Sequence, residues 1–183
     1  MTGERIHLGC GNEILPGWIN HDLAELPGVD VVHDLDSYPW PFADDRFAEV
    51  RMHHVLEHLS EPVRAIEELH RITGDGGTVE VRVPYWNSTD WASDPTHKTA
   101  FSEYSFDFFD PDTRHGHERP YYSTARFTIR SKTYWMKPAA VYVPVRNEVG
   151  RKVLSGLARH FGGVIWVVEF ELVARKDAGQ ARE

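Results

Sequence analysis

The β-type run 5–8 leads directly into Gly9-Cys10-Gly11, and this turn constrains the fold of the chain more than any other feature. Glycine adopts a positive φ without strain and lets a ligand approach the backbone closely. A strand that ends in such a turn is typical of ligand-binding loops, although a tight turn without a ligand uses the same residues. The residues at the ends of the following strands therefore decide between a ligand-binding loop and a simple tight turn.

Those strand ends also carry side chains suited to ligand binding. Asp22 ends the apolar run 18–21, and Asp34 with Leu35 follows the run 29–33. A carboxylate at the end of the second strand of a nucleotide-binding sheet accepts hydrogen bonds from ribose hydroxyls. The run 47–52 ends in His53 and His54. Glycine, two acids and histidine thus follow four successive predicted strands.

This series resembles the class I S-adenosylmethionine-dependent methyltransferases, most closely their small type 11 branch. The shared motifs are L-G-C-G at 8–11, the strand-2 acid, D-L at 34–35, P-F-x-D-x-x-F at 41–47 and H-V-L-E-H-L at 54–59. The resemblance covers residues 5–85 and implies S-adenosylmethionine as cofactor. It places the methionine portion at Gly9 and Gly11, the ribose at Asp22, and the adenine at Asp34 and the Leu35 backbone. The implied cofactor set is Gly9, Cys10, Gly11, Asp22, Leu23, Asp34, Leu35, His53 and His54.

Two helices and two further strands are predicted downstream. Ser60 is expected to cap a helix that runs to residue 72 and precedes a strand over 78–84. A second helix is expected over 147–161 and a final strand over 164–174. The residues predicted to face inward are Val63, Ile66, Leu69 and Ile72 in the first helix, and Val149, Val153, Leu154, Leu157 and Phe161 in the second. The pattern indicates an α/β, Rossmann-like fold with a mostly parallel sheet and an antiparallel final strand.

The connections after the first two strands are too short for helices. Residues 12–17 and 24–28 make up these connections, whereas a parallel crossover normally takes about a dozen residues or more. The helices after strands 1 and 2 are therefore expected to be reduced or missing. The strands also alternate apolar with polar residues, which predicts one polar face of the sheet, bearing Arg5, His7, Glu49, Arg51, Glu80 and Arg82.

The chain is expected to form a single domain, 1–183, in three parts. Residues 5–85 would bind the cofactor, 86–145 would form an aromatic lid, and 146–176 would add the last helix and strand. Most aromatic residues of the chain lie in 85–142, where they suit either a satellite core or the wall of a pocket for a planar ligand. The expected substrate-binding residues are Tyr85, Trp86, Trp91, Asp94, His97 and Tyr104.

His54 and His97 are the candidate catalytic residues. Methyl transfer is an in-line displacement, so an N–H or O–H acceptor needs only alignment and a group that removes its proton, usually histidine. We expect N- or O-methylation of a small, planar metabolite, with no metal. Two alternatives stay open: a zinc hydrolase in which His54, Glu57 and His58 form H-x-x-E-H, and a non-catalytic nucleotide-binding module.

Composition limits the partners. Lys and Arg number 20 against 28 Asp and Glu, and a net charge of −8 argues against nucleic acid and for a small-molecule substrate. No apolar run predicts a membrane span or signal peptide, and the single cysteine, Cys10, fits a cytoplasmic protein without an internal disulfide. A homodimer is expected through the middle segment, 86–145, and not through the polar sheet face. The tail after Lys176 is expected to be disordered.

Overall fold

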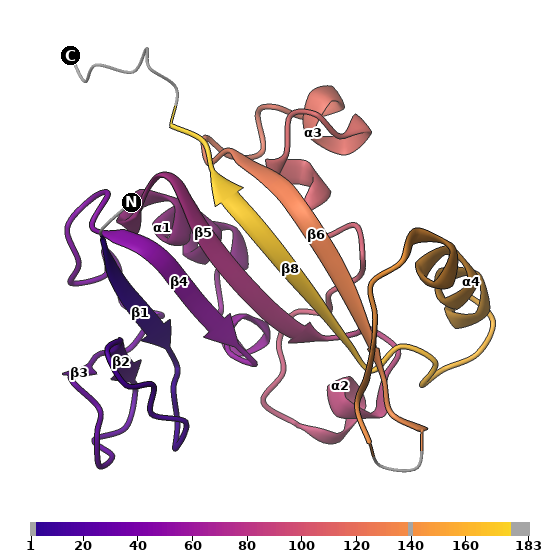
Figure 1. The fold of residues 1–183 in the computed structure, drawn as a ribbon, viewed down its shortest axis with the longest axis horizontal. Helices are drawn as coiled ribbons and strands as arrows, with labels where there is room; N and C mark the ends of the chain where they lie inside the picture. Colours follow the sequence, from indigo (N-terminus) through magenta and orange to yellow (C-terminus); the bar gives the residue numbers. More distant parts are fainter. Residues whose placement is uncertain (1–2, 139–140, 177–183) are drawn as a thin grey trace.

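The computed structural model describes residues 3–138 and 141–176, and its frame is one eight-stranded mixed sheet (Figure 1). The strand order is β3-β2-β1-β4-β5-β8-β6-β7. The parallel strands are β1 (Glu4–Leu8), β2 (Ile19–Asp22), β3 (Val31–Val32), β4 (Phe47–His53) and β5 (Thr73–Pro84), and the antiparallel ones are β6 (Phe127–Met136), β7 (Val143–Val145) and β8 (Val167–Ala174). The α/β, Rossmann-like fold with an antiparallel final strand is confirmed.

The helices are few and short. They are η1 (Leu56–His58), α1 (Pro62–Ile72), α2 (Thr89–Ser93), η2 (Asp107–Phe109), α3 (Arg114–Glu118) and α4 (Glu148–Ala158). Only turns connect β1 to β2 and β2 to β3. The prediction that helices are missing after the first two strands is confirmed. Within the described residues, no helix is long and apolar enough to cross a membrane.

The hydrophobic core lies on one face of the sheet. Ile6, Val50, Val81 and Phe170 from four neighbouring strands are fully or almost fully buried there, together with Leu69 of α1. These positions alternate with the polar ones, so burying the apolar set fixes which side of each strand faces α1.

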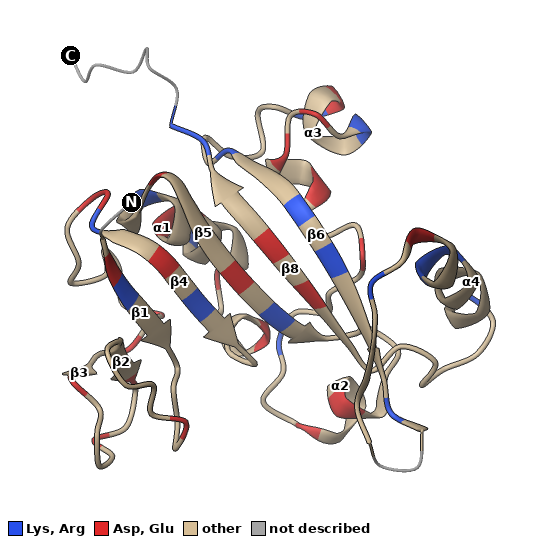
Figure 2. Cartoon of the chain, in the orientation of Figure 1, with Lys and Arg blue, Asp and Glu red and all other residues tan. Residues whose placement is uncertain are grey.

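The opposite face of the sheet is polar, as the alternation predicts. Ion pairs link neighbouring strands on this face. Charged residues of both signs follow one another across β4, β5, β8 and β6 (Figure 2). Arg82 pairs with Glu169, and Arg130 with Glu171. His7 also lies on this face, but its ring is buried and its Nδ1 lies 3.1 Å from the carbonyl oxygen of Glu13.

Several predicted details are wrong. Ser60 does not cap α1: its hydroxyl donates to Asp36, and Glu61 occupies the cap position. Val63 is exposed, whereas Ile66, Leu69 and Ile72 are buried as predicted. Residues 127–136 form the long strand β6 instead of part of a lid, because Phe127 and Tyr134 pack into the core.

The prediction for the second helix is wrong at its end and on its inward face. Asn147 caps α4 as the predicted start implies, since its side chain accepts from the Gly150 amide, but the helix ends at Ala158. Most of the apolar residues expected to face inward are exposed: Val149, Val153, Leu157 and Phe161. Leu154 and Ala158 are buried, so only a narrow strip of α4 contacts the sheet. The tail after Lys176 lies outside the described residues.

Candidate functional site at the carboxyl ends of the parallel strands

Gly9-Cys10-Gly11 turns sharply after β1 and is held by β2. The Cys10 amide donates to the His21 carbonyl oxygen at 2.9 Å, and the Gly11 amide donates to Asp22 Oδ2 at 2.8 Å. Gly9 and Gly11 both have positive φ, +67° and +52°. A Cβ at Gly9 would lie 2.2 Å from Val55, whereas one at Gly11 would meet nothing within 4 Å. Gly9 is therefore required for packing, and Gly11 opens onto free space.

The acids after β2 and β3 organise their own turns. Asp22 uses its second oxygen, Oδ1, to accept from the Ala24 amide at 3.0 Å, so both carboxylate oxygens fix the backbone beside the glycine turn. Asp34 is exposed and accepts from the Asp36 amide. Leu35 is buried in the core, while Leu23 is exposed. The Leu35 side chain is therefore not available to a ligand, which leaves its backbone.

His53 and His54 end β4 but point to different surroundings. His53 Nε2 lies 2.5 Å from Glu80 Oε1 on the polar face, and this hydrogen bond holds the pKa of Glu80 below its usual range. The backbone of His54 has a φ of +54°, which is unusual for a residue other than glycine. Such residues cluster at functional sites. Its ring lines a cavity of about 150 Å³ together with Arg82, Trp135, Tyr142 and Val167.

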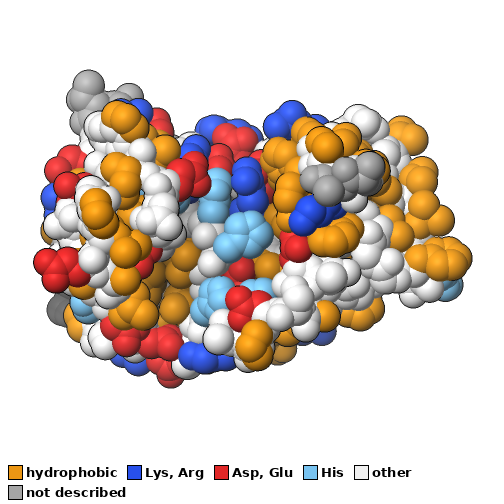
Figure 3. Space-filling view, turned by 90° about the horizontal axis from the view of Figure 1, so that it is seen from below, with side chains coloured by type: hydrophobic (Ala, Val, Ile, Leu, Met, Phe, Trp, Pro, Cys, Tyr) orange, Lys and Arg blue, Asp and Glu red, His pale blue; other side chains and the backbone are white. Residues whose placement is uncertain are grey.

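Histidine side chains gather on the side toward which the arrowheads of β1, β4 and β5 point. The space-filling view shows them in a hollow at the middle of the molecule, beside acidic and basic groups (Figure 3). His54 Nδ1 lies 3.5 Å from Glu57 Oε1, and His97 Nε2 lies 3.9 Å from the same oxygen. The His97 and His58 rings lie 4.7 Å apart, centre to centre. Residues of β4, η1 and the loop after α2 thus meet here.

The predicted substrate residues divide between two places. Trp91 stacks on the His97 ring at 5.1 Å, and Asp94 caps the loop by accepting from the Thr96 amide. Trp86 is half-exposed, and Tyr85 is buried, where burial raises its pKa and its hydroxyl donates to Glu103. Tyr104 lies elsewhere, because it lines a second cavity.

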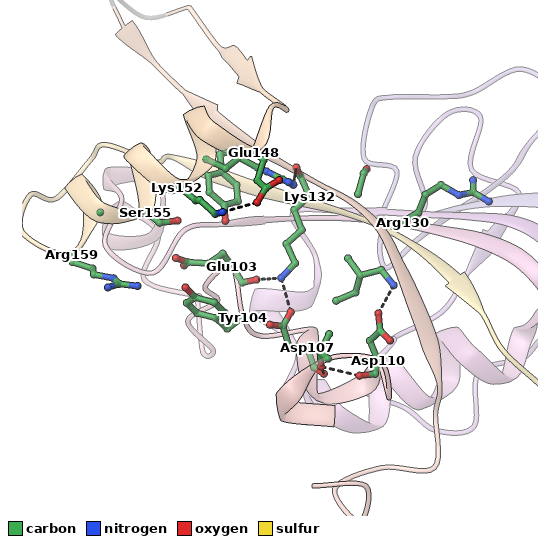
Figure 4. A pocket seen from close by; sticks show the side chains of 16 residues that line it. Glu103, Tyr104, Asp107, Asp110, Arg130, Lys132, Glu148, Lys152, Ser155 and Arg159 are labelled. Atoms are coloured by element: carbon green, nitrogen blue, oxygen red, sulfur yellow. Dashed lines mark hydrogen bonds and ion pairs between the residues drawn. The ribbon is translucent and has the colours of Figure 1, made fainter. Parts of the chain in front are cut away.

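That second cavity measures about 540 Å³ and lies between η2, β6 and α4 (Figure 4). Two ion pairs form within its lining: Lys132 Nζ lies 2.5 Å from Asp107 Oδ1, and Lys152 pairs with Glu148. None of its lining residues comes from β1–β5. This cavity is therefore separate from the strand ends that carry the glycine turn.

Several side chains of the site were not among the residues predicted to form it. Arg82, Trp135 and Tyr142 line the cavity beside His54. Arg82 lies over the Trp135 ring, 4.9 Å from its centre, and the Tyr142 hydroxyl donates to Asp90. Trp135 and Tyr142 belong to the aromatic stretch already noted, but their approach to His54 depends on β6 pairing with β8, which no local pattern indicates.

The geometry also bears on the zinc-hydrolase alternative. The H-x-x-E-H arrangement needs both histidines on one helical face. Here η1 begins only at Leu56, and His54 lies before it in a left-handed conformation. His54 and His58 therefore do not share a helix.

Comparisons with known proteins agree with this fold. Residues 6–81 match the family model of the Methyltransf_11 methyltransferase domain. An uncharacterized methyltransferase of Schizosaccharomyces pombe is 50% identical over 42 residues, which cover 23% of this chain and only 15% of that protein.

Two solved structures share the fold at low sequence identity. A methyltransferase of Thermotoga maritima, described as a possible histamine N-methyltransferase, has a TM-score of 0.60 at 14% identity, covering 96% of this chain and 84% of its own. An S-adenosylmethionine-dependent methyltransferase of Archaeoglobus fulgidus has a TM-score of 0.58 at 17% identity, covering 94% and 86%. Residues 6–81 thus match a Methyltransf_11 methyltransferase domain within a fold shared with S-adenosylmethionine-dependent methyltransferases, and this family implies S-adenosylmethionine as the methyl donor.

Proposed function

We propose that this protein transfers a methyl group from S-adenosylmethionine to a nitrogen or oxygen atom of a small, planar metabolite. The observation that carries the proposal is the cavity of about 150 Å³ in which His54 faces Arg82, Trp135 and Tyr142 at the end of β4. A titratable histidine and aromatic walls are what such an acceptor requires.

The cofactor would lie along the ends of β1, β2 and β3. Gly11 offers free space for the methionine portion, and Asp22 has lone pairs left to accept from the ribose hydroxyls. Asp34 and the Leu35 backbone would contact the adenine. S-adenosylmethionine supplies an activated methyl group on its sulfonium, and the chain supplies the alignment.

The acceptor would bind between the sulfonium and the aromatic walls. Trp135 and Tyr142 would hold a planar ring, and Arg82 would favour an electron-rich or anionic one. His54 would remove the acceptor proton because its ring lines the cavity. His97, the other predicted base, faces Glu57 and lies outside the lining of this cavity, so we assign it a positioning role.

Product formation from methyl-labelled S-adenosylmethionine over a panel of phenols and heteroaromatic amines tests this function. We expect turnover with part of the panel, and a kcat roughly 10²–10⁴-fold lower for His54→Ala, with the affinity for S-adenosylhomocysteine nearly intact. His160→Ala, which alters an exposed histidine beyond α4, is the matched control and should keep full activity. Equal turnover of His54→Ala and wild type would remove His54 as the base. S-adenosylhomocysteine binding without turnover of any acceptor would favour the non-catalytic module.

A further inference from the structure

Glu57 is a buried carboxylate with an unsatisfied charge. Its side chain has no exposed surface, and neither of its carboxylate oxygens accepts a hydrogen bond from the described part of the chain. Burying a carboxylate in this way is costly unless a cation or hydrogen-bond donors compensate it. The groups that approach it most closely are imidazole nitrogens at 3.5 and 3.9 Å, beyond a normal hydrogen bond.

Two histidines beside this carboxylate have their Nδ1 atoms engaged. His97 Nδ1 lies 2.9 Å from the Trp91 carbonyl oxygen, which can only accept, so Nδ1 carries the proton. His58 Nδ1 lies 2.9 Å from Thr96 Oγ1, which donates its own hydrogen to Asp94 and therefore accepts from His58. In both neutral rings Nε2 keeps its lone pair. Metal-binding histidines are oriented in the same way, by a hydrogen bond from the second ring nitrogen.

One ligand atom from each of Glu57, His58 and His97 lies within 4.8 Å of the others. In a tetrahedral site with bonds of about 2.1 Å, ligand atoms lie roughly 3.4 Å apart, so closure by at most about 1.4 Å would suffice. The loop that carries His97 is already tied to η1, because the Lys98 and Thr99 amides both donate to the Glu57 carbonyl oxygen. Trp91, stacked on the ring, fixes the plane of His97.

We propose that Glu57, His58 and His97 bind a divalent transition-metal cation. Two imidazoles and one carboxylate select such a metal over Mg²⁺ or Ca²⁺, which prefer oxygen ligands, and three protein ligands leave coordination positions open. His54 Nδ1 lies 3.5 Å from Glu57 Oε1, and His54 also lines the cavity proposed for the acceptor, so the two sites adjoin the same residue. If the proposed function holds, the metal would bind the acceptor oxygen or nitrogen there and lower its pKa. This site differs from the H-x-x-E-H alternative, because His97 replaces His54 and Glu57 is a ligand.

Titration of chelator-stripped protein with Co²⁺, followed by calorimetry and by visible absorption, tests the site. We expect one Co²⁺ per chain with the absorption of a nitrogen- and oxygen-coordinated ion. His58→Ala and His97→Ala should each weaken binding at least tenfold, whereas His160→Ala should bind as wild type does. Absence of Co²⁺ binding, or binding that His97→Ala leaves unchanged, would overturn the proposal.

Glu57→Gln separates loss of a ligand from loss of the fold. Without metal, this variant should have a Tm at or above that of the wild type, since it removes a buried unpaired charge of nearly the same shape. Co²⁺ should raise the Tm of the wild type but not of the variant. A variant that Co²⁺ still stabilises would refute the ligand assignment. S-adenosylhomocysteine binding by the metal-free protein distinguishes the two proposals: binding without a Co²⁺ site refutes only the metal site, and the reverse result refutes only the proposed function.

Discussion

His21 in β2 is a buried histidine whose protonation should destabilise the folded protein at low pH. Its side chain is 1% exposed, and neither ring nitrogen has a hydrogen-bond partner within the described residues. Burial, with the nearby His33 as a smaller cause, lowers the pKa of His21 from 6.5 to about 4. The unfolded chain therefore takes up this proton at a higher pH than the folded chain does. The contribution of neutral His21 to the free energy of unfolding should be fully present above pH 6.5. It should be lost as the pH falls toward 4, by about 3 kcal/mol in total.

Urea unfolding at pH 7.5, 6, 5 and 4.5 checks this effect. We expect His21→Leu to flatten the fall in stability between pH 6.5 and 4.5, and His160→Leu to leave it unchanged. Buried His7 and partly buried His70 have lowered pKa values as well, mainly through desolvation, so some slope should remain in the variant. Identical pH profiles for His21→Leu and wild type would show that His21 titrates normally in the folded protein.

At the scale of elements, one side chain of α1 fastens the loop before β4. Arg71 donates to the carbonyl oxygens of Trp40 and Phe42 and to the carboxylates of Asp44 and Glu68. The hydrogen bonds to Glu68 are the main reason that the pKa of Arg71 is raised. Without the guanidinium, Glu68 and two carbonyl groups lose this donor, and Glu68 keeps the hydrogen bond from the Trp40 amide.

We expect Arg71→Ala to lower the free energy of unfolding by about 2–4 kcal/mol, measured by urea denaturation. Arg71→Lys should restore little, because an ammonium group cannot reach this fan of acceptors. Arg64→Ala on the same helix is the control, since the exposed Arg64–Glu61 pair should contribute less than about 1 kcal/mol. Equal losses for the Arg64 and Arg71 variants would contradict this role.

The elements that the sequence predicts are those with a local signal. The alternation in β1, β4 and β5 and the residues that follow these strands are visible in short windows. The face of α4 and the strand β6 were not predictable in this way, because they depend on which distant strand each one meets: β6 lies between β8 and β7. The same holds within the site. Glu57 and His58 stand in a recognisable motif, but their approach to His97 depends on how the loop after α2 folds back onto η1.

At the scale of the whole molecule, the exposed aromatic residues support the predicted homodimer through the middle segment. Tyr121 is 76% exposed, and Tyr122 and Trp86 are about half exposed. Light scattering at micromolar concentration should give a dimer, and Tyr121→Asp should give a monomer. Val149→Asp, on the exposed face of α4 outside this segment, should stay dimeric. A monomeric wild type would contradict the prediction, and a dimer that only Val149→Asp disrupts would place the interface on α4.

Calorimetric titration of the protein with S-adenosylhomocysteine tests the central claim most directly, namely that the glycine turn and Asp22 form the cofactor site. We expect one molecule bound per chain. Asp22→Ala should bind it more than tenfold more weakly, because a hydrogen bond to a charged group contributes about 1.5–3 kcal/mol, and Asp22→Asn should lie between the two. Absence of binding by the wild type, or equal affinity of Asp22→Ala and wild type, would contradict the claim.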